Sequence, residues 1–547
     1  MKRSLMLIAL IILTMDSFAQ VQQEWVRTFN TMPDYYDHAL KLIVDGNGNI
    51  ICSGNNSNNE LVLIKYDERG DVLWLKRYNF MQNNQNQAIS DIQIDSSNNI
   101  FLTGYFDWNK VLTIMLNENG DTVWSRIFES NSTGVFRGPS IAVDSNIYVC
   151  LDGFDTVSNA MILKYDKTGN LLWMRNIVSA PITDLVKVMI DYQGNIILTG
   201  SYFFSLGNNS DIFIVKLKPD GNLIWRKNYN AGYPDSPYDM FIDRNNNTYI
   251  LGQTGSVSLG FPVFSTFKYD SSGNNLWLSK YSATGFADDR PSAIYADYKG
   301  NVYITGSSHR TSSQFDITTI KYDSMGDSIW VRRFNGSTND TDCSNSIAVN
   351  SSGDIFVSGY TKGLYGYNFI NISYSSNGVI NWIDTIPAFI NQALLSTSSI
   401  KVSESENLYS LGSSWTANTN YDMTTIKYLN YSIGIQPIST EIPQYFSLHQ
   451  NYPNPFNPST KIKFQIPLMK GVSGEAGQLV TPGRDGVFTS LKIFDILGRE
   501  VRSLVNESLN PGIYEADFNA AELPSGIYFY KLQAGGFVDS KKMVYVK

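Results

Sequence analysis

The sequence predicts an all-β chain in which an eight-bladed β-propeller, closed by pairing of its N- and C-terminal strands, precedes a small immunoglobulin-like β-sandwich. Three observations carry this prediction. Tryptophan recurs eight times at intervals of 49 to 53 residues, β-rich runs alternate with Asn-, Asp- and Gly-rich turns within each interval, and this period stops after residue 428. Few charged residues (17%) and many aromatic residues (13%) also suit packed sheets better than helices.

The first 19 residues have the layout of a secretory signal peptide. Met1-Lys2-Arg3 is a positive start, LMLIALIILT follows as an apolar run, and the small residues Ser17 and Ala19 precede a cleavage point at Gln20. The apolar run of ten residues is half the length that a membrane-spanning helix requires. We therefore expect export of a mature protein without a transmembrane segment.

The tryptophans mark one hairpin of each repeat. Seven of the eight stand four residues after a glycine, as in LIKYDERGDVLW and TFKYDSSGNNLW. Asp at the first position of such a turn and Gly at a position of positive φ are typical of a tight hairpin between two strands. The tryptophans are Trp25, Trp74, Trp124, Trp173, Trp225, Trp277, Trp330 and Trp382, and the glycines are Gly70, Gly120, Gly169, Gly221, Gly273, Gly326 and Gly378.

A second hairpin lies between consecutive tryptophans, as in DIQIDSSNNIFLTG at 91–104 and IYADYKGNVYITG at 294–306. Each repeat thus contains four short strands, which is typical of a β-propeller blade, and we assign 20–430 to one ring. EWVRTFN at 24–30 is a lone fourth strand, and MTTIKY at 423–428 is a third strand without a successor. Pairing these two strands would complete an eighth blade and remove two exposed sheet edges.

The repeated tryptophan is best explained as a packing residue. A bulky ring on the outer strand of every blade is expected to pack against the neighbouring blade, burying about 150–250 Å². The alternative is a ring of ligand-stacking aromatics, which would require eight equivalent ligands.

The repeats resemble the bacterial propeller repeats known as SBBP repeats. The resemblance rests on the YDxxGxxxW and GNxYxTG cores and extends over 24–428. It implies a propeller but no particular activity, because such scaffolds carry many different binding surfaces. Eight-bladed quinoprotein dehydrogenases share the Gly-to-Trp spacing. Here, however, the segment from Asp67 to Gly70 is one residue shorter than in those enzymes, and no two cysteines are adjacent.

Composition argues against several other classes of function. A net charge of −8 and a pI near 5.1 disfavour a nucleic-acid-binding protein. Three dispersed cysteines and three isolated histidines form neither a metal-binding spacing nor a disulfide framework. Asp45-x-Asn47-x-Asn49 begins like a calcium loop, but its twelfth position is Asn56 rather than Glu, so we expect a turn. We predict no catalytic, cofactor-binding or metal-binding residue.

The loops after the second strand of each blade vary most and contain aromatic residues among Asn and Ser. Because loops on a rigid scaffold commonly carry binding sites, these aromatics are candidates for contact with a glycan or protein ligand. The alternative is that the rings pack over the ends of their own loops. The candidate ligand-face residues are Trp108, Tyr202, Tyr365 and Trp415.

Residues 431–444 read as a linker to a second domain at 445–547. NYPNPFNPST at 451–460, FDILGREV at 494–501 and a basic C-terminal strand resemble the type A C-terminal sorting domain of the type IX secretion system. The stretch at 468–486 departs from the family as a Gly-rich insertion. The matching residues are Asn451, Tyr452, Pro453, Asn454, Pro455, Phe456, Asn457, Pro458, Gly498, Pro511, Gly512, Tyr514, Gly526, Tyr528, Lys541 and Lys542.

This second resemblance implies two partners, the type IX translocon and its sortase. The chain would then pass through the periplasm and be displayed at the outer cell surface or released. Together these observations predict an exported propeller with a non-enzymatic binding or structural role. A secreted enzyme on a propeller scaffold, either quinoprotein-like or a hydrolase, stays open as the alternative.

Overall fold

The computed structural model describes residues 23–30, 37–56, 60–79, 87–106, 110–129, 138–151, 159–179, 182–203, 210–255, 261–283, 288–310, 313–364, 366–390, 398–416, 419–428, 435–439, 442–468, 487–509, 511–520 and 523–547. The predicted signal peptide and most of the predicted insertion at 468–486 lie outside these ranges. The chain divides into two compact units, one formed by residues 20–430 and the other containing 431–547.

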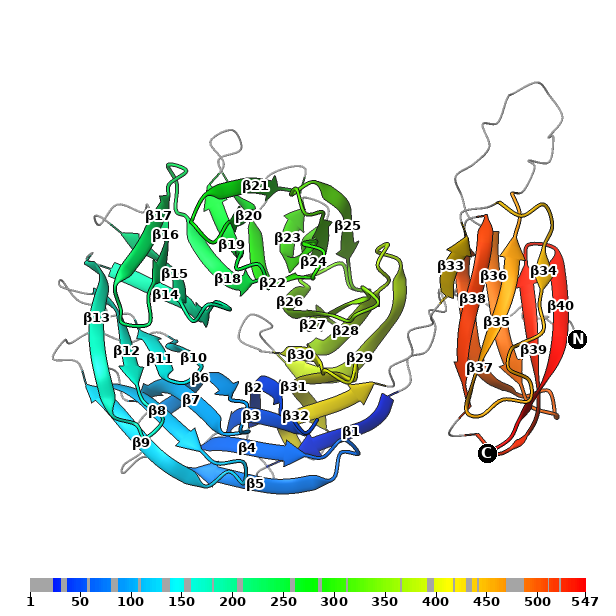
Figure 1. Ribbon diagram of the computed structural model, residues 1–547, viewed down its shortest axis with the longest axis horizontal. Coiled ribbons are helices and arrows are strands. Elements are labelled where there is room, and N and C mark those ends of the chain that lie inside the picture. Colours follow the sequence, from blue (N-terminus) through cyan, green and yellow to red (C-terminus); the bar gives the residue numbers. More distant parts are fainter. Residues whose placement is uncertain are drawn as a thin grey trace, which may run out of the picture. The chain divides into compact units, whose positions relative to one another are not determined.

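The first unit is all-β, which confirms the predicted fold class. Within its described residues, eight four-stranded antiparallel sheets are arranged around a central axis, with the first strand of each sheet innermost (Figure 1). We call these sheets blades 1 to 8 in chain order. The tryptophans lie on the fourth, outermost strand of each blade.

Blades 1 to 4 contain β2 (Asp37–Val44), β3 (Ile50–Asn56), β4 (Leu61–Tyr66) and β5 (Val72–Tyr78); β6 (Gln87–Ile94), β7 (Ile100–Phe106), β8 (Lys110–Leu116) and β9 (Thr122–Glu129); β10 (Ser140–Val143), β11 (Ile147–Leu151), β12 (Asn159–Tyr165) and β13 (Leu171–Ser179); and β14 (Ile182–Ile190), β15 (Ile196–Phe203), β16 (Ser210–Leu217) and β17 (Leu223–Tyr229).

Blades 5 to 8 contain β18 (Ser236–Ile242), β19 (Thr248–Gly255), β20 (Pro262–Tyr269) and β21 (Asn275–Tyr281); β22 (Asp289–Ala296), β23 (Val302–Arg310), β24 (Ser313–Tyr322) and β25 (Ser328–Phe334); β26 (Cys343–Val349), β27 (Ile355–Lys362), β28 (Tyr367–Tyr374) and β29 (Ile380–Ile390); and β30 (Ser399–Val402), β31 (Leu408–Thr416), β32 (Thr419–Tyr428) and β1 (Gln23–Phe29).

Blade 8 is built from both ends of the unit. Its fourth strand is β1, which pairs antiparallel with β32 in a register that places Val26 opposite Ile426. The backbone groups along this side of β32 are therefore used in a sheet ladder, where an exposed edge would otherwise invite pairing with another chain.

The Asp-x-x-Gly turns form the hairpins because the aspartate replaces missing backbone partners. In the first turn, Asp67 Oδ1 accepts hydrogen bonds from the backbone N–H groups of Arg69 and Asp71, both at 2.9 Å. Gly70 has a φ of +81° and donates its N–H to the Asp67 carbonyl. Positive φ strains any residue with a Cβ, so this position requires glycine.

Each turn glycine also provides the surface on which the tryptophan of the preceding blade packs. A Cβ placed at Gly70 would lie 2.7 Å from Trp25 Cδ2, and one at Gly326 would lie 2.7 Å from Trp277 Cδ2. The indole therefore lies directly on the backbone of the next turn. This contact explains why glycine and tryptophan recur together in the sequence.

The carbonyl two residues before the turn glycine joins the two blades by hydrogen bonds. Glu118 O accepts the indole N–H of Trp74 at 3.0 Å and a hydrogen bond from Lys65 Nζ at 3.2 Å, both from blade 1. The same pair of donors converges on Glu68, Ser271, Ser324 and Ser376, so five junctions share this arrangement. We call each of these acceptors a junction carbonyl.

At two of the five junctions the lysine is buried and paired with an aspartate of its own blade. Lys65 Nζ lies 2.8 Å from Asp45 Oδ2, and Lys216 Nζ lies 2.8 Å from Asp191 Oδ2; all four side chains are 5% exposed or less. Burial alone would raise the pKa of Asp45, but hydrogen bonds from Lys65 and Asn49 outweigh it and hold that pKa below its ordinary value. A buried pair is stable only when its remaining donors are satisfied, and here the junction carbonyl does so.

The last junction differs because blade 8 has no turn between its third and fourth strands. Trp382 stacks instead on Tyr428, with ring centroids 4.9 Å apart and planes at 28°. Asp384 Oδ2 accepts a hydrogen bond from the Tyr428 hydroxyl at 2.8 Å and another from Gln23 Nε2 at 2.7 Å. One carboxylate of blade 7 therefore holds both terminal strands of blade 8.

The second unit consists of two four-stranded sheets that share one core. One sheet has the order β33-β38-β35-β34 and the other β37-β36-β39-β40. Ile462 and Phe464 of one sheet and Tyr530 and Leu532 of the other are fully buried in it. The strands are β33 (Ile435–Ser439), β34 (Ser447–Leu448), β35 (Ser459–Ile466), β36 (Val487–Phe494), β37 (Glu500–Leu509), β38 (Gly512–Asn519), β39 (Gly526–Ala534) and β40 (Phe537–Tyr545).

The predicted linker at 431–444 is partly wrong, because it contains strand β33. This strand pairs with β38 at the edge of its sheet, with Pro437 opposite Tyr514. A proline lacks the N–H of a central strand but is tolerated at an edge. A five-residue strand with a proline has no clear alternation, so the sequence pattern did not reveal it.

The junction predicts a large difference between two glycine-to-alanine substitutions. Gly70→Ala adds a methyl group against Trp25 at a positive φ, and we expect a loss of about 2–4 kcal/mol in unfolding free energy. Gly48→Ala is the matched control, since Gly48 has the same φ of +81° but no atom within 4 Å of the added Cβ. Urea unfolding of both variants checks this, and equal losses would contradict the junction's role.

Candidate functional site

The structure describes the strands that contain two of the four predicted ligand-face residues, Tyr202 and Trp415. Tyr202 is 2% exposed, stacks on Phe213 at 6.1 Å and lies under the Arg226 guanidinium, so its assignment to a ligand face is wrong. The reason is that β15 continues to Phe203, which makes Tyr202 a sheet residue rather than a loop residue. Trp415 also lies in a strand, β31, with its backbone opposite Tyr421. Trp108 and Tyr365 lie outside the described residues.

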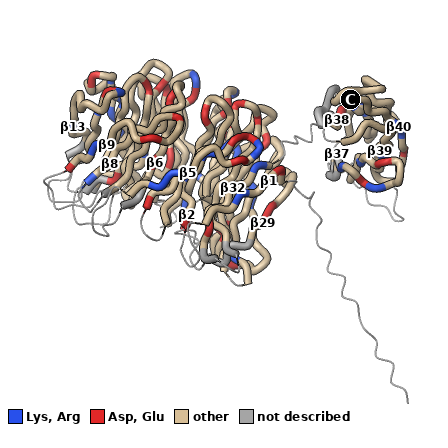
Figure 2. Tube along the Cα trace, turned by 90° about the horizontal axis from the view of Figure 1, so that it is seen from below, with Lys and Arg blue, Asp and Glu red and all other residues tan. Residues whose placement is uncertain are grey.

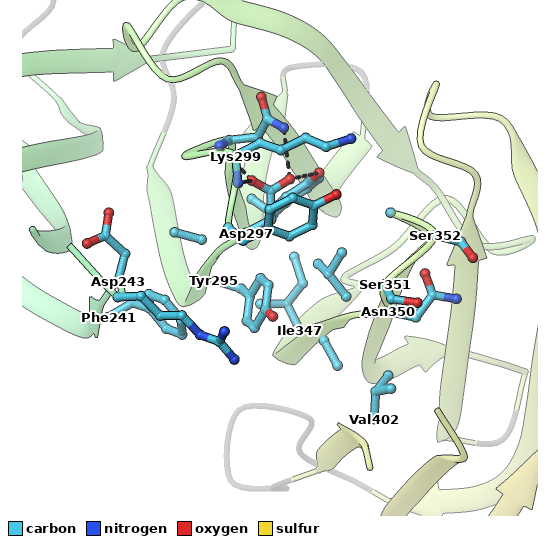
Figure 3. A pocket seen from close by; sticks show the side chains of 18 of the residues that line it. Phe241, Asp243, Tyr295, Asp297, Lys299, Ile347, Asn350, Ser351, Ser352 and Val402 are labelled. Atoms are coloured by element: carbon cyan, nitrogen blue, oxygen red, sulfur yellow. Dashed lines mark hydrogen bonds between the residues drawn. The ribbon is translucent and has the colours of Figure 1, made fainter. Parts of the chain in front are cut away.

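A cavity of about 750 Å³ lies at the other end of the blades, where the turns join the first and second strands. Its walls come mainly from the innermost strands of blades 5 to 8 and the turns beside them, and Tyr192 of the corresponding turn of blade 4 also lines it. Phe241, Tyr295, Ile347 and Val402 line its inner part (Figure 3). Tyr192 and Tyr298 lie at its rim and are 67% and 73% exposed.

Two aromatic rings form one wall of the cavity. The ring centroids of Phe241 and Tyr295 are 5.0 Å apart, with their planes at 51°. Both residues stand two positions before the turn aspartate of their blades. The equivalent residues of blades 1 to 4 are Ile43, Gln93, Ala142 and Met189. Comparison of the repeats at this one position would have revealed the site from the sequence.

The aspartates beside the cavity are used by the fold. Asp297 Oδ1 accepts the N–H groups of Lys299 and Asn301, both at 2.9 Å, and its Oδ2 accepts Asn301 Nδ2 and the Tyr303 hydroxyl. Asp243 is held by the equivalent four donors of its own turn. The Asp45 turn has the same amide contacts, in place of a calcium loop. These carboxylates therefore stabilise turns.

Metal ligation has no support in the described part of the chain, where no three His, Cys, Asp or Glu side chains gather around a common point. Acidic and basic residues are interspersed over the propeller unit, as the coloured tube in Figure 2 shows. The feature that best distinguishes one part of the propeller from the others is therefore the cavity with its aromatic wall.

Three buried aspartates lie at the opposite end of blades 5 to 7 and tie loops together. Asp235 accepts the N–H groups of Ala231 and Gly255, and Asp342 accepts those of Gly336 and Lys362. Asp289 accepts the Ser308 hydroxyl. Burial raises the pKa of each of these three carboxyl groups to about 6, and the hydrogen bonds offset that effect only in part.

In the second unit, the NYPNPFNP segment fixes the C-terminal strand. Asn451 is 2% exposed, and its Nδ2 donates to Pro453 O at 3.0 Å and to Thr460 Oγ1 at 2.9 Å. Phe456 is buried and forms a parallel bridge with Tyr545, donating its N–H to Val544 O at 3.0 Å. Strand β40, which carries Lys541 and Lys542, is therefore held along its end by this segment.

The other predicted motif residues form turns and core of the same unit. Gly498 closes the turn between β36 and β37 with a φ of +76°. Tyr514 stacks on Phe464 at 5.5 Å, and the buried Tyr528 donates its hydroxyl to Pro524 O at 2.8 Å. Asn454 Oδ1 accepts the N–H of Val544 at 2.9 Å. The remaining motif positions, Tyr452, Pro455, Asn457, Pro458, Pro511, Gly512 and Gly526, lie in or beside these turns and strands.

Comparison with known proteins identifies the second unit. Residues 450–547 match the family model of the secretion system C-terminal sorting domain, and residues 279–311 match that of the beta-propeller repeat. Both predicted resemblances are therefore confirmed. An uncharacterized WD repeat-containing protein of Acanthamoeba polyphaga mimivirus is 27% identical over 187 residues, which cover 29% of this chain and 13% of that protein.

Solved structures with similar folds have low sequence identity to this chain. The polysaccharide lyase Uly1 has a TM-score of 0.42 and 10% identity, covering 75% of this chain and 100% of its own. The WD40 domain of SCAP from fission yeast has a TM-score of 0.40 and 8% identity, covering 74% and 98%. A protein of unknown function from Bacteroides caccae has a TM-score of 0.31 and 13% identity, covering 55% and 94%.

The sorting domain marks this chain for type IX secretion to the cell surface or the extracellular space, and it implies contact with the type IX machinery. No helix in the described ranges has the length and apolar character needed to span a bilayer.

The export role predicts a truncation phenotype. A chain that ends at residue 430 keeps the complete propeller unit but loses the sorting domain, so we expect it to accumulate in the periplasm. Cell fractionation and surface proteolysis measure this, with the full-length chain as the control. Display of the truncated chain at the normal level would contradict the prediction.

The three buried aspartates predict a pH dependence of stability. Their pKa values are about 6 in the folded protein against an ordinary 3.8, so the folded state holds these protons more tightly. The stability they contribute is complete below about pH 4 and is lost as pH rises through 6, by about 3 kcal/mol per group.

Asp235→Asn removes one of these protonation sites. The free energy of unfolding of this variant, relative to that of the wild type, should therefore rise by up to about 3 kcal/mol between pH 4 and pH 7.5. Urea unfolding at several pH values measures the difference. Asp71→Asn, on an exposed turn, is the control and should show no such trend. A difference for Asp235→Asn that does not vary with pH would refute the assignment.

Proposed function

We propose that this exported propeller is a non-enzymatic binding protein that holds its ligand in the aromatic cavity at the turn end of blades 5 to 8. The arrangement of the cavity carries the proposal. Flat rings from Phe241 and Tyr295 form a wall, while the nearest turn carboxylates, Asp243 and Asp297, are each occupied by four donors of their own turn.

This occupancy favours binding over catalysis. A general acid or base must reach the substrate with a free lone pair or an exchangeable proton. Glu406 Oε2 accepts the N–H of Ser351 at 3.0 Å and thus connects the turns of blades 7 and 8. The side chains that remain available to a ligand are mostly aromatic, amide, hydroxyl and cationic, and Glu404 is one carboxylate among them.

A glycan is the ligand class that this surface fits best. Sugar rings present C–H faces that pack on aromatic side chains, and the rim tyrosines Tyr192 and Tyr298 extend the aromatic surface beyond the inner wall. A ring-shaped scaffold of this kind holds such side chains in place because each blade is fixed by both neighbours.

Binding of the full-length protein to a glycan array tests this proposal. Tyr295→Ala and Phe241→Ala should each weaken binding at least tenfold, because they remove the stacking wall. Gln93→Ala is the matched control, since Gln93 occupies the same repeat position in blade 2 and does not line the cavity.

Two outcomes would contradict the proposal. One is glycan binding that is unchanged in both cavity variants. The other is conversion of the bound glycan to products detectable by mass spectrometry, which would assign an enzymatic function.

A further inference from the structure

The channel inside the ring contains three lysines and two aspartates that interact electrostatically. Lys41 forms an ion pair with Asp91 of the next blade, and Lys187 Nζ lies 2.5 Å from Asp239 Oδ1 of its next blade. Lys401, on β30, interacts electrostatically with all four of these side chains. The five residues come from the innermost strands of blades 1, 2, 4, 5 and 8.

Both aspartates accept backbone N–H groups of the ring as well as their lysine. Asp91 Oδ1 accepts the N–H of Ile92 and Oδ2 accepts that of Ile141, while Asp239 accepts those of Met240 and Ile294 in the same way. Each carboxylate therefore links its own blade to the following one and also receives the lysine of the preceding blade. Asp91 Oδ2 also accepts the Ser140 hydroxyl, so both oxygens of Asp91 have two donors, whereas Asp239 Oδ2 accepts the Ile294 N–H as its one described donor.

Lys401 is left without a partner of its own. Among the residues that the structure describes, no hydrogen bond or ion pair reaches its ammonium group. Lys401 is exposed to solvent, but desolvation by the surrounding strands lowers its pKa to about 8, the ammonium groups of Lys41 and Lys187 lower it further, and Asp239 and Asp91 oppose this only in part. The channel thus holds three cationic side chains and two anionic ones.

Lys401 also lines the aromatic cavity, beside Val402 and across from Tyr295 and Phe241. We propose that the cavity binds an acidic sugar, with the Lys401 ammonium pairing with the sugar carboxylate and Tyr295 and Phe241 packing against its ring. This inference rests on the proposed binding function and specifies its ligand. With one bound carboxylate, this group of residues would have three positive charges, on the three lysines, and three negative charges, on the two aspartates and the ligand.

The charges around the cavity favour a single negative charge. Besides Lys401, the charged lining residues are the cations Arg244, Lys299 and Lys321 and the anions Asp243, Asp297, Glu404 and Glu406, and the two aspartates are held by donors of their own turns. A doubly charged phosphate would meet one unpaired ammonium group and two nearby glutamates. A uronate supplies one carboxylate on a flat-faced ring, which matches one lysine beside two aromatic rings.

Isothermal titration of the full-length protein with tetragalacturonate tests the inference. Fully methyl-esterified tetragalacturonate is the matched neutral probe, and it should bind at least tenfold more weakly than the acid. The Lys401→Met variant should bind the acid at least tenfold more weakly than the wild type does, while its affinity for the ester should change little. Lys492→Met removes one charge from the sorting domain and should leave both affinities unchanged.

Proton uptake on ligand binding is a second measurement, and it would not depend on Lys401 if this residue had only a structural role. The pKa of Lys401 is lowered to about 8, and pairing with a carboxylate raises it, so binding near that pH takes up protons. Titrations at pH 8 in buffers of different ionisation enthalpy should show net proton uptake in the wild type and none in Lys401→Met.

The outcomes separate the inference from the proposed function. Equal affinity for acid and ester, or for wild type and Lys401→Met, overturns the inference while leaving a glycan-binding cavity. Absence of binding to every glycan on the array overturns both. Tighter binding of tetraglutamate than of tetragalacturonate, or of a sulfated sugar than of the uronate, also overturns the inference, because the cavity would then recognise an acidic peptide or a sulfate.

Discussion

The ring depends on one repeated interaction, the junction carbonyl that receives donors from the preceding blade. At five junctions the same oxygen accepts a tryptophan N–H and a lysine Nζ, and the tryptophan ring lies on the turn glycine two residues later. The turn of each following blade therefore holds two strands of the blade before it, the third strand through the lysine and the fourth strand through the tryptophan. Apolar burial holds the blades together without direction, whereas these hydrogen bonds set their orientation.

Closure of the ring and the proposed ligand site both lie where this pattern is interrupted. Blade 8 takes its fourth strand from the start of the chain and so has no turn for Trp382, and the Asp384 carboxylate takes over by holding Tyr428 and Gln23. Inside the ring, the alternating Lys–Asp pairs serve four blades and leave Lys401 unpaired. Asp384 and Lys401 thus both stand at positions where one blade differs from the repeated pattern.

The sequence predicted the repeating features and the sorting domain, whose motifs are specific, and it missed contacts and strand ends that no motif marks. The period of the tryptophans and the Asp-x-x-Gly turns identified the propeller, because packing and turn geometry demand those residue types at fixed spacing. The lysine before each turn was visible in LIKYDERG, but its contact with a carbonyl in the next blade requires knowledge of how blades stack. Tyr202 was misassigned because polar and aromatic letters after a strand do not show where that strand ends.

Hydrogen exchange in Trp330→Phe tests the junction carbonyl most directly. This substitution removes the indole N–H donated to Ser376 O and keeps an aromatic ring on Gly378. The account predicts that amide protection falls on both sides of the junction, in β24 and β25 of blade 6 and in β28 and β29 of blade 7. Loss of protection confined to β25, with blade 7 unchanged, would contradict the claim that this hydrogen bond joins the blades.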